Sequence, residues 1–270
     1  MLITATGLVV RSYTSGNTDR ILHILTEEYG RLSVMVKGSS SKKSNHVAPY
    51  AQLLTYGNYE LYQGHSGDLY WLRGGSVETS FYKLTEDIVS MALAAYLCDV
   101  AADLTPEEAG ETNSGLLLKD LLNSLYVLLN GMRSPAMVKA VFELRAAALM
   151  GYCPDLSGCG TCGQKTPDNA YLDVMGGRLI CADCQTKRNR VRNTGHTADE
   201  FRGHTVVCPI SSSVLTAMRY IAEAPPKKIF SFSMKDTEEE RALERAVETF
   251  LLTHLEREYE TLKFYRSVSV

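Results

Sequence analysis

Two pairs of cysteines constrain this chain more than any other feature of its sequence. Cys159 and Cys162 form one C-x₂-C pair, Cys181 and Cys184 form a second, and eighteen residues separate the pairs. This spacing is typical of a four-thiolate zinc site, because each tight turn brings two sulfur atoms to one side and two such turns complete a tetrahedron. Four thiolates leave no open coordination position, so the pattern predicts one structural Zn²⁺ per chain rather than a catalytic metal.

A pair of disulfides and a redox-active pair are the alternatives for these cysteines. Residues 1–6 show no basic start followed by an apolar segment, so no secretion signal is predicted. No apolar run approaches the ~18 residues that span a bilayer. We therefore expect an intracellular protein, in which thiols stay reduced or bind metal. A redox-active pair would stand in a βαβ unit, which the sequence around Cys159 does not suggest.

The first 80 residues have the pattern of short β-strands. Their apolar residues alternate or are β-branched, and turns such as residues 28–30 separate the runs. The runs cover residues 6–13, 20–26, 31–37, 53–62 and 68–72. Five short strands at this spacing favour a small barrel, for which an OB-fold is a natural candidate.

From residue 81 onward, apolar residues recur at the spacing typical of α-helices. The first predicted helix ends near Thr105, and Thr237 is expected to cap the last one, with Glu240 reaching back to it. The other predicted helices cover residues 115–129, 134–150, 211–224 and, after the cap, 241–258. Between the cysteine pairs, residues 171–174 and 178–180 predict a β-ribbon.

These patterns predict an α+β multidomain protein with an N-terminal OB-fold β-barrel, then an α-helical domain with an inserted four-cysteine zinc module. The length of 270 residues and a hydrophobic content of 45% suit two or three folded units. The expected domains are residues 1–80 for the barrel, 81–152 with 209–270 for the helical domain, and 153–208 for the zinc module.

Basic residues gather in two places, although the net charge is −3. The stretch from Arg31 to Asn45 contains Lys37, Lys42 and Lys43, four serines after Gly38 and no acid. Such a loop between barrel strands can bind a phosphate backbone, or it can be an ordinary solvated loop. The second cluster follows the second cysteine pair and could extend a DNA-binding surface or keep the zinc module soluble; it comprises Lys187, Arg188, Arg190 and Arg192.

Aromatic residues lie near the first basic stretch. OB-folds bind single strands by stacking bases on such rings, although we expect most of these rings to pack in the barrel core. They are Tyr50, Tyr56, Tyr59, Tyr62, Tyr70 and Trp71.

Motifs of common enzyme classes are missing from the sequence. It contains no G-x-x-x-x-G-K-[ST] phosphate loop, no H-E-x-x-H and no G-x-S-x-G. The P-C-x-x-C element of zinc deaminases is also missing, since Ile180 precedes Cys181. We therefore predict no catalytic residues and no enzymatic activity.

The chain as a whole resembles the RecO family of bacterial DNA repair proteins. The resemblance rests on TEEYGRL at 26–32, VKG at 36–38, GYCPDL at 151–156 running into the first cysteine pair, and GGRL at 176–179 before the second. The resemblance implies a non-enzymatic recombination mediator that binds single- and double-stranded DNA and anneals complementary strands. It also implies cooperation with RecR and the single-stranded DNA-binding protein in loading RecA, in the cytoplasm and associated with the nucleoid.

Mapped onto this sequence, the resemblance makes Lys37, Lys42 and Lys43 the expected DNA contacts, with Arg31 and Arg11 as further candidates. A zinc-ribbon adaptor that binds proteins without touching DNA is the competing hypothesis. Its support is the net charge and the acidic segment 81–152, which has five Lys or Arg against nine Asp or Glu.

Overall fold

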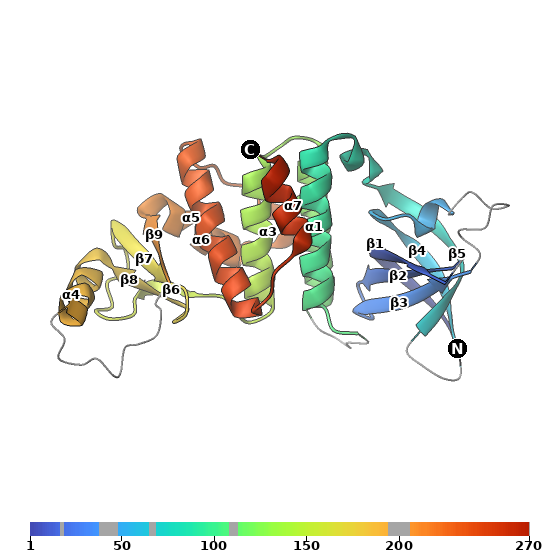
Figure 1. Cartoon of the computed structure of the whole chain (residues 1–270), viewed down its shortest axis with the longest axis horizontal. Helices are drawn as coiled ribbons and strands as arrows, with labels where there is room; N and C mark the ends of the chain where they lie inside the picture. The colour runs from blue at the N-terminus through green and yellow to red at the C-terminus, as the bar shows by residue number, and fades with distance from the viewer. Residues whose placement is uncertain (17–18, 38–47, 65–68, 108–112, 194–205, 270) are drawn as a thin grey trace. The chain divides into compact units, whose positions relative to one another are not determined.

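The first five strands alternate between core and surface residues and close into a barrel. In β3, Leu32 and Val34 are buried, whereas Arg31, Ser33 and Met35 alternate with them on the outer face. The strands, in the order β1-β2-β3-β5-β4 around the barrel, are β1 (Leu2–Ser15), β2 (Asp19–Thr26), β3 (Arg31–Val36), β4 (Thr55–Gln63) and β5 (Leu69–Ser80) (Figure 1). Neighbouring strands are antiparallel except β3 and β5, which are parallel.

The structure is a computed structural model that describes residues 1–16, 19–37, 48–64, 69–107, 113–193 and 206–269. It forms two compact units, the first made of residues 1–135 with 259–270 and the second of residues 136–258. The boundary divides the helices between the two units. The expected division into barrel, helical domain and zinc module stays a prediction.

The closed barrel confirms the predicted OB-fold. Its core is built from apolar side chains such as Leu22, Ile24, Tyr59 and Leu61. Close strand contact in β4 requires a glycine, because a Cβ atom at Gly57 would collide with the carbonyl oxygen of Ser76 on β5. Strand β5 extends eight residues beyond the predicted end at residue 72.

Helices α1 (Ile88–Leu104), α2 (Ser114–Leu129) and α7 (Glu260–Val268) complete the first unit, and α7 lies beside α1 (Figure 1). Arg11 of β1 joins the barrel to α1, since its Nε lies 2.6 Å from Asp99 and its Nη1 lies 2.9 Å from Asp103. Thr261 of α7 donates a 2.8 Å hydrogen bond to the same Asp99 carboxylate. Asp99 therefore connects three elements of this unit.

The second unit combines a four-stranded sheet with helices. The sheet has the order β6-β8-β7-β9, with β6 (Asp155–Cys159), β8 (Arg178–Cys181), β7 (Asn169–Asp173) and β9 (Val207–Ser211). The helices are α3 (Pro135–Leu149, in this unit from Ala136), α4 (Ala182–Asn193), α5 (Ser212–Glu223) and α6 (Thr237–Leu255). Strands β7 and β8 pair antiparallel, which confirms the predicted ribbon between the cysteine pairs. Short 3₁₀ helices cover Pro49–Ala51 and Tyr82–Glu86 in the first unit and Pro226–Lys228 in the second.

The predicted cap of the last long helix was wrong by one residue. Asp236, not Thr237, caps α6, because its Oδ1 accepts a 2.9 Å hydrogen bond from the backbone N–H of Glu239. Both side chains can cap a helix, and only the backbone geometry decides between them. Helix α6 also ends before residue 258, since Glu256 has the left-handed φ of 49°. Helices α4 and α7 were not predicted.

No helix in the described part of the chain has both the length and the apolar character needed to cross a bilayer.

Candidate metal centre and nucleic-acid interface

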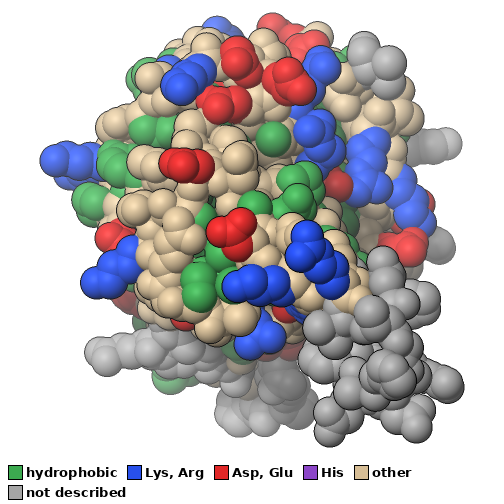
Figure 2. Space-filling model, turned by 90° about the vertical axis from the view of Figure 1, so that its left-hand side faces the viewer, with side chains coloured by type: hydrophobic (Ala, Val, Ile, Leu, Met, Phe, Trp, Pro, Cys, Tyr) green, Lys and Arg blue, Asp and Glu red, His purple; other side chains and the backbone are tan. Residues whose placement is uncertain are grey.

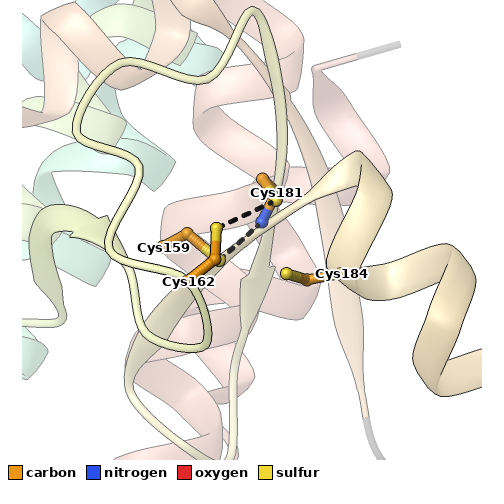
Figure 3. Close-up of side chains that lie close together, drawn as sticks. All are labelled: Cys159, Cys162, Cys181 and Cys184. Atoms are coloured by element: carbon orange, nitrogen blue, oxygen red, sulfur yellow. Dashed lines mark hydrogen bonds between the residues drawn. The ribbon is translucent and has the colours of Figure 1, made fainter.

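The fold brings the four predicted zinc ligands together. Strands β6 and β8 are parallel, so Cys159 and Cys181 at their carboxyl ends meet at one edge of the sheet. Cys162 lies in the turn after β6, and Cys184 lies in the first turn of α4 (Figure 3). The four sulfur atoms all lie within 4.8 Å of one another. This cluster is compatible with a metal site.

The turn that carries Cys162 is closed by backbone hydrogen bonds. The N–H of Gly163 donates to the carbonyl of Cys159 at 2.8 Å, and the N–H of Cys159 donates to the carbonyl of Gln164 at 2.9 Å. Gly163 has φ +76°, a conformation that side chains other than that of glycine rarely adopt. The turn thus aims two sulfur atoms in one direction.

One distance between sulfur atoms of the cluster has the value expected for a tetrahedral zinc site. A Zn–S bond of ~2.3 Å places two thiolates of a tetrahedron ~3.8 Å apart. The Sγ atoms of Cys162 and Cys181 are 3.7 Å apart. All seven cysteines are free thiols, so the structure contains no disulfide that would compete with this arrangement. The donor set of four thiolates is one that soft metal ions such as zinc prefer.

Hydrogen bonds in the metal-free cluster favour a thiolate at Cys159. Burial raises the pKa of this thiol, but N–H groups of Cys181, Cys162 and Thr161 outweigh burial and lower it to about 6. The Cys181 N–H lies 3.2 Å from the Cys159 Sγ (Figure 3). Hydrogen bonds with the thiol groups of Cys181 and its neighbours raise the pKa of Cys184 to about 12. These contacts therefore favour negative charge on the Cys159 sulfur atom within the cluster.

Buried charges outside the cluster fix the elements that carry it. Asp173, at the end of β7 and 2% exposed, accepts a 3.1 Å hydrogen bond from Arg188 of α4. Arg219 of α5 donates at 2.7 Å both to the carbonyl of Leu156 before the first cysteine pair and to the carbonyl of Lys165 after it. Sequence reasoning missed Asp173 and Arg219, because neither belongs to a motif.

The second basic cluster is divided between structural and surface roles. Arg188 pairs with Asp173, whereas Lys187 and Arg190 are exposed, and the side chain of Arg192 lies outside the described residues. Figure 2 views the side that is on the left in Figure 1, where α4 is drawn. Lys and Arg side chains are interspersed there with Asp and Glu. The described residues of this face form no continuous basic patch.

The barrel has a groove on its outer face where cations flank aromatic rings. Its volume is about 430 Å³. Tyr62 of β4 and Trp71 of β5 are direct cross-strand partners in the groove. The Nζ of Lys37 lies 4.5 Å from the centre of the Trp71 ring, and the guanidinium carbon of Arg73 lies 5.2 Å from the centre of the Tyr62 ring. Met35 and Leu72 complete the lining.

The other expected DNA contacts lie in different surroundings. Lys42 and Lys43 are outside the described residues. Arg31 donates from Nη2 to the Glu107 carboxylate at 3.0 Å, so this cation already has an acidic partner. Arg11 is 15% exposed and directs its donors at Asp99 and Asp103, which gives it a structural role.

Comparison with known proteins decides which family has this combination of barrel and cysteine cluster. Residues 1–81 match the family model described as "Recombination protein O N terminal", and residues 85–195 match the one described as "Recombination protein O C terminal". The chain belongs to the RecO family.

Individual members of the RecO family align with nearly the whole chain. A protein of Acetivibrio thermocellus named "DNA repair protein RecO" is 28% identical over 262 residues, which are 97% of this chain and 95% of the relative. A protein of the same name from Alkaliphilus metalliredigens is 28% identical over 260 residues, 95% of each chain. A third, from Clostridium acetobutylicum, is 24% identical and covers 87% of this chain and 85% of the relative. The resemblance inferred from sequence motifs is thereby confirmed.

Sequence reasoning found one part of the groove of this RecO family member and missed another. Lys37 and Trp71 were recognised as a basic and an aromatic residue near one another in sequence. Arg73 was missed, because the run of strand-forming residues was expected to end at residue 72. Alternation along β5 was the available signal, since Trp71 and Arg73 lie on the same face of a strand.

Proposed function

We propose that this chain is a non-enzymatic DNA-binding recombination mediator of DNA repair. In this role it anneals complementary strands and helps to load RecA onto single-stranded DNA, together with RecR and the single-stranded DNA-binding protein. The proposal is supported by the match to both RecO family models and by the name that the relatives share. The observation that carries DNA binding is the groove on the barrel, where Lys37 and Arg73 flank two exposed ring faces.

Lys37, Lys42 and Lys43 are the proposed phosphate contacts, and Arg31 is a further one. Lys37 is exposed and directly follows β3, and residues 38–47 with the other two lysines continue from it. Lysine and serine side chains at this position would hold the phosphate backbone without reading its sequence. Arg11 is left out of the proposed set, because Asp99 and Asp103 already neutralise it.

We propose one structural Zn²⁺ held by Cys159, Cys162, Cys181 and Cys184. The support is the tetrahedral spacing of the sulfur atoms and the complete set of four ligands. The ion would stabilise the small sheet and the helix α4 that carry the four cysteines.

A strand-annealing assay tests the proposed function. Two complementary labelled strands are mixed with the protein, with and without RecR and the single-stranded DNA-binding protein, and duplex formation is followed over time. We expect the protein to accelerate annealing and to do so on strands coated by the single-stranded DNA-binding protein. Absence of any binding to a labelled oligonucleotide at low salt would instead favour the adaptor hypothesis, because phosphate contacts are strongest there.

A further inference from the structure

We propose that Arg219 of α5 is a positioning residue of the metal centre, and that through Arg219 metal binding stabilises helix α5. The proposal rests on the proposed Zn²⁺ site and adds a residue that is not a ligand. Arg219 and the loop with the first cysteine pair both belong to the second unit. A residue of this kind acts by holding the ligands in the geometry that the metal needs.

One guanidinium group joins the two ends of the loop that carries the first cysteine pair. The Nε of Arg219 donates a 2.7 Å hydrogen bond to the carbonyl of Leu156, before the pair. Its Nη2 donates to the carbonyl of Lys165, after the pair, at 2.7 Å and to that of Ser157 at 3.3 Å. The planar guanidinium has its donors in a fixed arrangement, so it also fixes the spacing between the two ends of the loop. A lysine has all its donors on one nitrogen atom and cannot do the same.

The two sides of this loop lie in direct contact. A Cβ atom at Gly158 would be 3.0 Å from the carbonyl oxygen of Gln164, so the backbones pass each other without space for a side chain. The N–H of Cys159 donates to the same Gln164 carbonyl at 2.9 Å. The spacing that Arg219 sets at the base of the loop therefore also affects the sulfur atoms of Cys159 and Cys162, which lie beside each other (Figure 3).

The loop is also held on β8 by a contact that does not involve Arg219. The N–H of Gly160 donates to the carbonyl of Leu179 at 2.8 Å. Without Arg219 the loop would keep this contact, while the side that contains Lys165 would lose its hydrogen bond with α5. We expect such a variant to form the site but to hold the metal less tightly, because outer partners of metal ligands contribute about 10- to 100-fold to metal affinity.

Helix α5 is held at its end by a second arginine. Arg145 of α3 is 6% exposed, and its Nη1 donates to the carbonyls of Ile221 at 3.3 Å and Ala222 at 3.0 Å. These carbonyls belong to the last turn of α5, where backbone acceptors lack partners within the helix. Arg145 thus connects the helix to α3, and Arg219 connects it to the cysteine loop. A metal that orders the loop therefore also restrains α5, and by reciprocity the docked helix favours metal binding.

Metal affinity tests the positioning role of Arg219. The full-length protein is loaded with Zn²⁺, and a chromogenic chelator competes for the ion. Arg219→Ala should weaken Zn²⁺ binding by about 10- to 100-fold, and Arg219→Lys, which keeps the charge but not the planar group, should fall in the same range. Arg241→Ala removes an exposed arginine of α6 and serves as the matched control, with an expected change of less than about twofold. Equal affinity of Arg219→Ala and the unmodified protein would overturn the proposal.

The absorption spectrum of bound Co²⁺ separates a change in affinity from a change in ligands. At saturating Co²⁺ we expect each variant to show the spectrum of a tetrahedral site with four thiolates. Thermal unfolding of each variant shows whether the second unit is folded. Should Arg219→Ala not fold, Arg219→Lys provides the same test.

Hydrogen exchange tests the coupling between the metal and α5. In the unmodified protein we expect Zn²⁺ to slow exchange of the amides of residues 212–223 by about 5- to 150-fold, the usual range of coupling between sites. In Arg219→Ala saturated with Zn²⁺, the slowing relative to its metal-free form should be less than about twofold. The same slowing in both proteins would show that Arg219 does not connect the metal to the helix.

The outcomes distinguish this proposal from the proposed Zn²⁺ site. If the unmodified protein binds no metal, the site itself fails. If the unmodified protein binds one metal ion per chain and Arg219→Ala binds it equally tightly, the site stands and Arg219 is not a positioning residue.

Discussion

At the scale of single residues, the carboxylate of Glu107 occupies the position where a phosphate would meet β3. Its Oε1 accepts hydrogen bonds from the Nη2 of Arg31 at 3.0 Å and from the Oγ of Ser33 at 3.3 Å. The preceding residue, Pro106, fixes this geometry, because its carbonyl accepts a 3.3 Å hydrogen bond from the Arg31 backbone N–H. Glu107 would therefore compete with a phosphate for these two donors if Arg31 contacts DNA as proposed.

Removing this charge should strengthen DNA binding. We expect Glu107→Gln to raise the affinity for oligo-dT by up to about fivefold, since surface ion pairs contribute ~0.2–1 kcal/mol. The released Arg31 should also make the dependence of log affinity on log salt steeper by about 1. Anisotropy titrations over a series of salt concentrations measure both. Glu238→Gln removes an equal charge from an exposed position on α6 and controls for net charge. Unchanged affinity and slope in Glu107→Gln would show that the carboxylate does not compete.

His23 of β2 makes the stability of the barrel depend on pH. Burial lowers its pKa, the charges of Arg31 and Arg11 lower it further, and the carboxylates of Glu107 and Asp103 offset only part of this. Its Nδ1 is buried without a hydrogen-bond partner among the described residues. The folded state therefore binds fewer protons than the unfolded state, in which a histidine has a pKa of ~6.5.

It follows that the free energy of unfolding should decrease as the pH falls below ~6.5 and through the lower pKa of the folded state. His23→Gln cannot take up this proton, so its stability should decrease less over the same interval. Urea unfolding of both proteins at several pH values from about 7.5 to 5 gives the free energy of unfolding of each. The difference between the two proteins isolates the effect of His23, because the other titrating groups contribute equally to both. Parallel pH profiles of the two proteins would rule out this role of His23.

At the scale of elements, a buried lysine joins α3 to α6 in the second unit. Lys139 is fully buried, and its Nζ lies 3.1 Å from Glu143 of α3, 2.6 Å from Glu248 and 3.6 Å from Glu244 of α6. Burial alone would lower the pKa of Lys139, but the three carboxylates outweigh it and raise the pKa. The lysine is therefore charged, and it offsets the negative charge of the three carboxylates around it.

Replacing this lysine should destabilise the second unit strongly. Lys139→Met removes the cation that lies 3.1 Å from the buried carboxylate of Glu143, and loss of one partner of a buried ion pair costs ~3–5 kcal/mol. The change is measured as the difference in free energy of unfolding in urea. Lys119→Met is the matched control, because Lys119 has a 51% exposed side chain and a long 3.6 Å ion pair with Glu27. A double variant with Glu143→Leu should recover part of the loss, and equal effects of both lysine variants would contradict this account.

Apolar periodicity explains which elements could be predicted from the sequence. Strands such as β3 alternate strictly between buried and exposed residues, and their limits were predicted to within one residue. The end of β5 was missed because residues 76–80 are exposed and carry no alternation. Helix α4 was missed because the helix is mostly polar and is positioned by Cys184 of the cluster and by the Arg188–Asp173 ion pair rather than by an apolar stripe. Spacing alone was sufficient for the cysteine cluster.

At the scale of the whole molecule, the C-terminal residues 259–270 belong to the same compact unit as the N-terminal barrel. The ring of Tyr259 packs edge-on against Tyr96 of α1 at 5.6 Å between centroids, and Thr261 bonds to Asp99. Sequence reasoning placed residues 81–152 and 209–270 in one helical domain, and that division stays a prediction. No local pattern in the sequence marks a particular contact such as this one, between residues that are 162 positions apart. Such packing depends on how the side chains of distant residues fit together, which the apolar periodicity of the sequence does not show.

The division into two units predicts what removal of the metal would affect. All four cysteine ligands belong to the second unit, whereas Trp71 belongs to the first. Because binding of a structural zinc ion is coupled to folding of its module, Cys181→Ser should abolish the expected content of one metal per chain and lose part of the circular dichroism signal of the second unit. The emission spectrum of Trp71 should stay unchanged, since the barrel core contains none of the ligands.

Metal analysis by mass spectrometry and thiol titration together decide the state of the cysteines. Titration of the denatured, metal-free protein should find all seven thiols, whereas disulfides would lower that number by two for each bridge. Cys153→Ser, a substitution of an exposed cysteine outside the cluster, should keep the metal and the folded module. Loss of the metal in Cys153→Ser, or its retention in Cys181→Ser, would mean that the ligand set differs from the four cysteines of the cluster.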